Sequence, residues 1–329
     1  MAEADRVLVY LGVLLAAFLI AQTDQRRQRF AEGIVFALIV VGVLGLATRL
    51  LPHVFPVAEG LGSGPRLRYP LGYWNANGVA CGIAAALVPW LSRRSLTPAL
   101  RWLAVACLPA VLLALYFTYS RGGVLALLVA GGCLLALSHD RLWMLGTLAI
   151  GVLGTAPAVL AVQARESLAD NLDNAAAVDQ GLTVLAILLA GTALTIGLFA
   201  LMHRLARRRG ALTGRAVAIS RDPRALRAAA IGFAVLALVA VLAVGGRAWD
   251  QFSSSDIEFP NQPQKHFGEA SGGGRHDFYR VALDAFGEKP IGGNGAGTYQ
   301  FSWYQLRDID LPVHDAHSLY LQALSELGI

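Results

Sequence analysis

Charged residues are scarce in this sequence, and their scarcity excludes an ordinary soluble domain. They make up 15% of the 329 residues, while hydrophobic residues make up 56%; a soluble domain carries about 25% charged residues. The net charge of +5 is spread between apolar runs and forms no basic face, so we expect no nucleic-acid partner. Cysteine is also scarce. Cys81, Cys107 and Cys133 all lie inside apolar runs, where no extracytoplasmic disulfide is expected.

Long apolar runs are what the sequence has instead. A bilayer-crossing helix needs about 20 mostly apolar residues, and backbone groups in lipid must be satisfied within the segment. We therefore predict an all-α polytopic membrane protein whose partner is the lipid bilayer, with about eight transmembrane helices. The apolar windows are 6–22, 33–51, 76–91, 102–119, 122–138, 142–163, 181–203 and 229–246.

The predicted domains follow from these windows. Residues 1–246 form a transmembrane helical bundle, 247–316 an extracytoplasmic loop lobe, and 317–329 the start of a ninth span. Because this last helix is only begun at Ile329, we expect the chain to be C-terminally incomplete. One set of alternate loops holds 15 arginines and the opposite set 7. The richer set should be cytoplasmic, which places the loop at 52–75, Arg121 and the lobe outside.

Three arginines on the predicted outer side are candidates for anion binding. Arg121 lies in a short loop between two apolar runs; it either snorkels to lipid headgroups or presents a rigid, permanently charged fork to phosphate. Arg66 and Arg68 precede the third span and could add to such a site. The residues after them have plainer roles: Tyr73 and Trp74 suit the aromatic belt, and Asn75 and Asn77 could cap the following helix.

The lobe contains a second group of candidates. An amphipathic helix is predicted at 276–287, with Arg275 and Arg280 at its start. A glycine turn with Gly293 and Gly295 follows, and the amides of such turns favour anions, although most glycine-rich loops are only turns. Asp308 and Asp310 mimic the spaced carboxylates of nucleotide-sugar enzymes, but a solvated turn is the simpler interpretation.

His317 is the candidate for proton chemistry. A neutral imidazole takes a proton from a hydroxyl near its pKa of about 6.5, and a helix start at the membrane surface would orient it; otherwise the residue merely marks the interface. His314 is either on the same helical face or in the preceding loop. The pair lacks a third zinc ligand, so we predict no metal.

The order of these motifs resembles one known family. The segment His317–Gly328 is similar to the histidine-asparagine, tyrosine-leucine and glutamate-leucine-glycine signature of the O-antigen ligase and O-antigen polymerase-like family of bacterial membrane glycosyltransferases, with Ser318 in place of the asparagine. Arg275 and the turn at 289–295 look like the family's arginine-headed helix and proline-glycine turn. Ser120-Arg121 look like its serine-arginine pair, and 69–75 is similar to a segment of actinobacterial members.

The resemblance implies a function. It is transfer of a glycan from undecaprenyl pyrophosphate to a hydroxyl of a glycan, lipid or protein acceptor, by a ligase or polymerase of cell-surface polysaccharide. The reaction would be inverting, would need no cofactor or metal, and would occur at the outer face of the bacterial cytoplasmic membrane. Residue by residue, the resemblance implies that Arg121 and Arg275 hold the pyrophosphate and that His317 is the base.

A transporter or flippase of an anionic lipid-linked glycan is the alternative. Such a protein would use the same arginines for binding, but it would line its spans with polar or charged side chains along a pathway. The predicted span interiors contain almost none. We therefore favour the enzyme.

Overall fold

The computed structural model describes residues 2–57, 64–95, 97–208 and 274–329, and every regular element in these ranges is a helix. The chain divides into two compact units. The described part of one is residues 19–208, here called the membrane bundle. The other contains residues 2–18 and 274–329, of which 274–329 are here called the C-terminal unit. The helices are α1 (Ala2–Ile20), α2 (Asp24–Leu50), α3 (Trp74–Arg94), α4 (Pro98–Phe117), α5 (Arg121–Leu137), α6 (Arg141–Gln163), α7 (Glu166–Ala169), α8 (Ala175–Arg208), α11 (Arg275–Glu288), α12 (Tyr299–Leu306) and α13 (Leu319–Leu327).

Seven of the eight predicted windows coincide with helices, namely α1 to α6 and α8. The eighth window, 229–246, and the predicted domain boundary at 246 lie outside the described residues. Among the described residues, four helices are long and apolar enough to cross a membrane: α2, α4, α6 and the part of α8 from Ala175 to Ala206. The apolar stretches Val7–Ile20 in α1 and Arg121–Leu137 in α5 are shorter. A helical membrane protein is therefore supported, while the number of eight spans is not confirmed.

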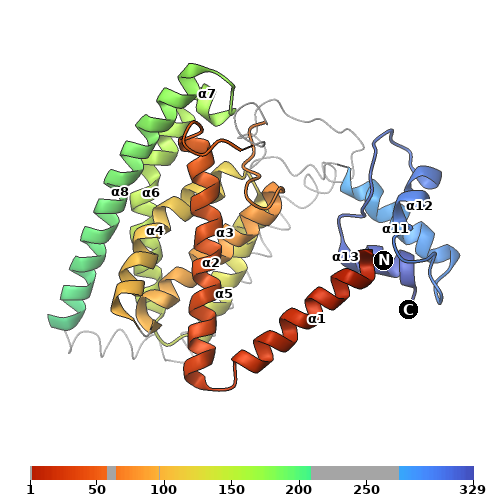
Figure 1. Cartoon of the computed structure of the whole chain (residues 1–329), viewed down its shortest axis with the longest axis horizontal. Helices are drawn as coiled ribbons and strands as arrows, with labels where there is room; N and C mark the ends of the chain where they lie inside the picture. Colours follow the sequence, from red (N-terminus) through yellow and green to blue (C-terminus); the bar gives the residue numbers. More distant parts are fainter. Residues whose placement is uncertain (1, 58–63, 96, 209–273) are drawn as a thin grey trace, which may run out of the picture. The chain divides into compact units, whose positions relative to one another are not determined.

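The membrane bundle is built around α3 (Figure 1). This helix packs against α2, α4, α5 and α6, while α8 packs against α2, α4 and α6. The side chains that α3 buries are mostly small, among them Ala80, Ala84 and Ala85. A helix covered by other helices does not need the long apolar surface of a lipid-exposed one, which explains why α3 is less hydrophobic than α4, α5 and α6.

Glycines allow the closest helix contacts in the bundle. A Cβ atom on Gly82 of α3 would collide with the carbonyl oxygen of Gly123 in α5, and one on Gly78 would lie 2.6 Å from Ser120 Cβ. Gly154 of α6 and Gly191 of α8 approach each other in the same way. Small residues at such crossings let helix backbones approach in a membrane, where hydrophobic association between helices is weak.

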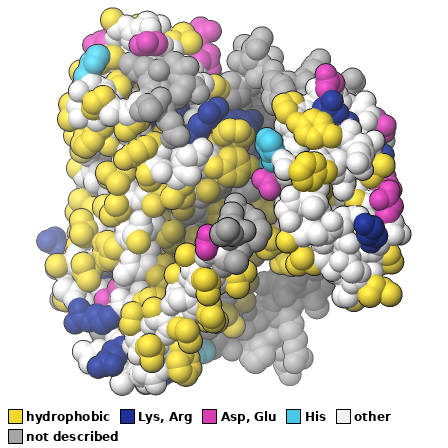
Figure 2. Space-filling model, turned by 45° about the vertical axis from the view of Figure 1, so that its right-hand side comes forward, with side chains coloured by type: hydrophobic (Ala, Val, Ile, Leu, Met, Phe, Trp, Pro, Cys, Tyr) yellow, Lys and Arg dark blue, Asp and Glu magenta, His cyan; other side chains and the backbone are white. Residues whose placement is uncertain are grey.

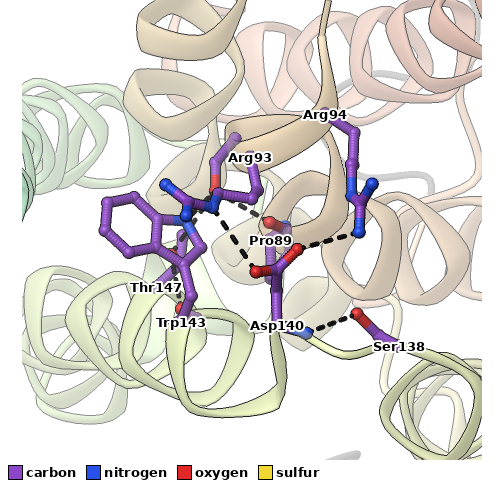
Figure 3. A network of polar contacts seen from close by, with 8 residues as sticks. Pro89, Arg93, Arg94, Ser138, Asp140, Trp143 and Thr147 are labelled. Carbon is purple, nitrogen blue, oxygen red and sulfur yellow. Dashed lines mark hydrogen bonds and ion pairs between the residues drawn. The ribbon is translucent and has the colours of Figure 1, made fainter. Parts of the chain in front are cut away.

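One end of the bundle is tied together by arginines around Asp140 (Figure 3). Arg93 Nε lies 3.5 Å from Asp140 Oδ1, and Arg94 Nη2 lies 3.0 Å from Oδ2. The Arg93 guanidinium also lies over the Trp143 ring, 5.1 Å from its centroid. Trp143 Nε1 donates a hydrogen bond of 3.0 Å to Ser92 Oγ. The end of α3 is thereby fixed to the beginning of α6.

The opposite end is tied together by the buried side chain of Arg49. Its guanidinium donates to the carbonyl oxygens of Leu168 at 3.2 Å and Pro65 at 2.9 Å, and lies over the Phe117 ring. The ends of α2 and α4, the segment before α3 and α7 therefore meet at this end.

The two predicted sets of loops thus lie at opposite ends of the bundle. Figure 2 shows hydrophobic side chains along the visible face of the bundle and charged side chains near its ends. The assignment of the outer end stays a prediction.

The C-terminal unit has a small core of its own. Phe278 and Val281 of α11, Tyr299 and Trp303 of α12, and Ala316 are buried together. The Phe278 and Trp303 rings meet edge to face, with centroids 5.1 Å apart. α13 packs against α11, so residues 319–327 belong to this unit. That they also begin a membrane span stays a prediction.

Candidate active site

Arg275 is the first residue of α11 and is placed there by a glycine. Gly274 is the residue before the helix and has φ of 79°, a left-handed conformation that glycine adopts at little cost. Phe278 lies one helical turn after Arg275, so both side chains are on the same face of α11. Arg275 is half-buried and Phe278 is buried. The core residue Phe278 therefore fixes the helix face that presents the arginine.

His317 lies directly before α13, in a conformation that is unusual for its residue type. Its φ is 54°, in the left-handed region that costs a non-glycine residue about 1 kcal/mol or more. The following residue, Ser318, begins α13 and accepts a hydrogen bond of 3.4 Å from Leu321 N. Ser318 therefore caps α13. The His317 ring is exposed on one side and lies against Phe278 on the other, with centroids 5.3 Å apart.

His317 therefore lies against Phe278, on the helix face that also carries Arg275, and the charge of Arg275 acts on the imidazole. The pKa of His317 is lowered below its ordinary value of 6.5, first by partial desolvation and next by the positive charge of Arg275, while Asp315 acts in the opposite direction. A lowered pKa keeps the imidazole neutral near pH 7, and only a neutral imidazole accepts a proton.

Arg280 has a different environment from that of Arg275. Its Nη2 lies 2.7 Å from Asp308 Oδ2 and 3.9 Å from Asp277 Oδ1, and its Nη1 lies 3.4 Å from Asp284 Oδ2. Three carboxylates of the same unit thus surround this guanidinium. Arg275 makes no ion pair within the described part of the chain, so its charge is the one directed to His317 and to solvent.

The glycine turn is anchored by its own amides. Gly293 N donates to Lys289 O at 2.9 Å, and Gly295 N donates to Glu326 O at 2.8 Å. A Cβ atom on Gly293 would collide with the backbone at Glu326, so glycine is needed for this approach. Substrate binding by Gly293 and Gly295 stays a prediction, but these two amides already donate to protein carbonyls.

Glu326 holds this turn and α12 together, a role that the sequence analysis did not find. Its buried carboxylate accepts hydrogen bonds from Gly297 N at 2.8 Å and Tyr299 N at 3.2 Å, where α12 begins. Negative charge is favourable at a helix N-terminus. The glutamate-leucine-glycine end of the signature was the available signal, because a charged residue in an apolar helix needs a partner.

His314 and the two aspartates before it are exposed and paired with side chains of the unit. His314 Nδ1 lies 2.9 Å from Gln300 Oε1. Asp310 Oδ1 lies 2.8 Å from Arg307 Nη2, and Asp308 is paired with Arg280. The carboxylates of Asp308 and Asp310 therefore face arginines from this unit.

Arg66 and Arg68 belong to the membrane bundle, and both guanidinium groups lie over the indole ring of Trp74. Their guanidinium carbons lie 5.0 Å and 5.2 Å from the centroid of Trp74 at the start of α3. The segment that carries them is fixed by Asn77, whose amide donates to the carbonyls of Leu67, Arg68 and Tyr69. An indole face attracts a guanidinium and orients it. Two positive charges are thus held at the start of α3.

Arg121, the first residue of α5, is brought near the start of α3 by a hydrogen bond between the two helices. Ser120 Oγ donates to Asn75 Oδ1 at 2.8 Å and accepts from Gly123 N at 3.1 Å, which caps α5. The predicted capping of α3 by Asn75 and Asn77 is wrong. Tyr73 precedes the helix without a side-chain cap, because α3 begins at Trp74 and both asparagines lie within it. The N-terminal ends of α3 and α5, with Trp74 and Arg121, are therefore joined at one end of the bundle.

An apolar groove runs along the bundle beneath Arg121. It has a volume of about 400 Å³ and is lined by residues of α4, α5 and α6, including Tyr116, Val124 and Val159. Val124 is one helical turn after Arg121, so the groove begins next to the arginine.

Residues 181–329 match a family model described as O-Antigen ligase. Neither the curated proteins nor the solved structures contain a match to this chain. The matched segment includes Arg275, the glycine turn, His317 and Glu326, whereas Arg121 lies before it. The match confirms the resemblance suggested by the motifs: over residues 181–329, this chain is similar to the O-antigen ligase family.

Proposed function

We propose that this protein is a membrane glycosyltransferase that moves a glycan from a polyprenyl pyrophosphate, such as undecaprenyl pyrophosphate, to an acceptor hydroxyl. The observation that supports the proposal most directly is that the charge of Arg275 acts on His317, whose ring lies against Phe278. A proton acceptor thus lies near a positive charge that has no ion-pair partner among the described residues, an arrangement that suits transfer from a pyrophosphate ester. The family match supports a glycosyltransferase of the ligase or polymerase type in general.

The chemistry assigned to the two residues is a single displacement. A ring nitrogen of His317 accepts the proton of the acceptor hydroxyl as its oxygen forms a bond to the anomeric carbon. The bond from that carbon to the pyrophosphate oxygen breaks, and the negative charge gathers on the polyprenyl pyrophosphate. Arg275 stabilises this charge more strongly in the transition state than in the bound donor. One displacement inverts the anomeric centre.

The membrane bundle, taken by itself, has features that suit a lipid-linked donor. Arg66 and Arg68 are held over Trp74 and, with Arg121, offer positive charge to phosphate, while the groove along α4, α5 and α6 suits an apolar isoprenoid chain. Because arginines supply the positive charge, we expect transfer to continue in the presence of a metal chelator. The outer face of the cytoplasmic membrane is the proposed location, following the arginine distribution.

A turnover assay in lipid nanodiscs tests the proposal. Labelled polyprenyl-pyrophosphate glycan and a crude acceptor mixture are supplied, and release of free polyprenyl pyrophosphate is followed. We expect His317→Ala to lower the rate by about 10²–10⁴-fold and Arg275→Lys by about 10²–10³-fold, because a lysine does not reproduce the bidentate fork. Glu288→Gln, an exposed change at the other end of α11, is the matched control and should keep the wild-type rate.

Two outcomes would contradict the proposal. Full turnover by His317→Ala would remove the base from the mechanism. No release by the wild-type protein, with labelled lipid crossing the bilayer of proteoliposomes instead, would identify a transporter.

A further inference from the structure

We propose that one side of α12 is a binding subsite for the sugar rings of the acceptor, so that the acceptor itself is a glycan. The subsite, here called the α12 strip, consists of Gln300, Tyr304, Arg307 and His314. This inference rests on the proposed function, because it names the class of acceptor for His317.

The strip follows from the helical geometry of α12. Tyr299 and Trp303 are buried and define the inner face of the helix. Gln300, Tyr304 and Arg307 are spaced by four and three residues, so their side chains share an adjoining face. His314 extends this face, since its Nδ1 lies 2.9 Å from Gln300 Oε1. Four planar polar or aromatic groups therefore lie in one row.

Tyr304 supplies a surface for a sugar ring. Its side chain is 48% exposed, and the Arg307 guanidinium lies over its ring, 4.9 Å from the centroid. A pyranose has an apolar C–H face that packs on an aromatic ring, and hydroxyls around its edge that need hydrogen-bond partners. The neighbouring amide, imidazole and guanidinium groups provide both donors and acceptors.

The charge of the strip favours a neutral ligand over a phosphate. Arg307 Nη2 lies 2.8 Å from Asp310 Oδ1, so its charge is balanced locally. Arg280, which reaches the end of α12 at Leu306 O, is balanced by Asp308. Figure 2 shows side chains of both signs beside hydrophobic ones on this unit. An anion site would carry unbalanced arginine, as at Arg275, whereas neutral sugars suit the strip.

The strip leads to the proposed base. His314 is three residues before His317, and the segment between them is held by the buried Ala316, whose N donates to Gln322 Oε1 at 3.3 Å. A glycan lying on Tyr304 and Gln300 would therefore have its terminal residue near His317. Holding the acceptor by several rings orients one hydroxyl for deprotonation.

Saturation-transfer NMR on the protein in nanodiscs, without donor, tests the subsite directly. The probes are short neutral oligosaccharides of glucose, mannose, galactose and arabinose. We expect the wild-type protein to bind at least one of them and Tyr304→Ala to bind it about three- to tenfold more weakly, the loss of one aromatic contact. Tyr304→Phe keeps the ring and should bind as the wild type does. Leu283→Ala, at an exposed residue of α11, is the control for surface changes.

Three results would overturn the inference. One is binding of no probe by the wild-type protein; another is equal binding by wild type and Tyr304→Ala. The third is a contact of the α12 strip with the membrane. It would be shown if spin-labelled lipid headgroups quenched a fluorophore attached to Tyr304→Cys in a Cys133→Ser background. Oligosaccharide binding is measured without donor, and in His317→Ala as well, so it does not depend on turnover. Failure of the α12 strip as a subsite can therefore be distinguished from failure of the proposed glycosyltransferase function.

Discussion

His317 lies between two charges of opposite sign, and its protonation depends on both. Arg275 lowers its pKa and Asp315 raises it, while partial desolvation is the largest cause of the lowered value. The sequence predicted the histidine and Arg275 from their motifs. It could not predict the balance of charges, because that depends on how α11 and the segment before α13 pack on Phe278.

The turnover rate should fall at low pH, where His317 becomes protonated, and the position of this acid limb should depend on the charges of Arg275 and Asp315. Asp315→Asn removes the charge that favours the imidazolium, so the pKa of His317 falls and the acid limb moves to lower pH. Arg275→Gln removes the charge that disfavours it, so the pKa rises and the limb moves to higher pH, together with a lower rate. The rate of polyprenyl pyrophosphate release is measured from about pH 4 to 8, a range that includes the pKa of free histidine. The acid limbs of the two variants should move in opposite directions from that of the wild type. Shifts in the same direction would exclude His317 as the titrating base.

The choice between Arg275 and Arg280 also required the structure. Both arginines lie at the start of the same predicted helix, and the residue pattern alone does not separate them, although the family resemblance favoured Arg275. Only tertiary contacts show that Asp308, far along the chain, pairs with Arg280. The capping roles expected for Asn75 and Asn77 failed because α3 begins before both of them, at Trp74, and Asn75 is instead bonded by Ser120, 45 residues away.

At the scale of elements, Glu326 of α13 orders the beginning of α12. Glu326→Ala should leave Gly297 N and Tyr299 N without an acceptor and destabilise the C-terminal unit by about 1–3 kcal/mol. Hydrogen–deuterium exchange of residues 297–303 should accelerate in this variant and stay unchanged in Glu288→Gln. Unchanged exchange in Glu326→Ala would show that the carboxylate does not hold the helix.

The contact between α3 and α5 allows a matched pair of substitutions. Gly82→Ala should lower the thermal midpoint, because its Cβ would meet the Gly123 carbonyl and overpacking costs about 1–3 kcal/mol. Gly132→Ala lies in α5 with no atom within 4 Å of the added Cβ and should be neutral or slightly stabilising. Equal thermal midpoints for the two variants in detergent would contradict the close crossing.

Elements were predicted well where hydrophobicity defines them. The helix predicted at 276–287 is confirmed as α11, Arg275–Glu288, and seven apolar windows lie on helices. α7 and α12 were not predicted. α12 is only eight residues long, follows a glycine-rich turn and buries two aromatic residues, which is too weak a periodic signal without the core that receives them.

At the scale of the whole molecule, the distribution of arginines among the loops predicts that the start of α3 faces the outside of the cell and the Asp140 end of the bundle faces the cytoplasm. Leu71→Cys, near the start of α3, should react with a membrane-impermeant maleimide in intact cells, in a Cys133→Ser background. His139→Cys, beside the Asp140 network at the opposite end, should react only after lysis. Both residues are exposed, so accessibility within the protein does not bias the comparison. The reverse pattern would place the start of α3 on the cytoplasmic side.

The hydrogen bonds between the glycine turn and α13 also constrain the time at which this unit can form during synthesis. Asn294 Nδ2 bonds to Ser325 O, 31 residues later in the chain, and Glu326 closes the start of α12. A nascent chain that ends before Ser325 therefore has neither contact. We expect the glycine turn and the start of α12 to become ordered only after α13 has been synthesised, because both depend on Ser325 and Glu326.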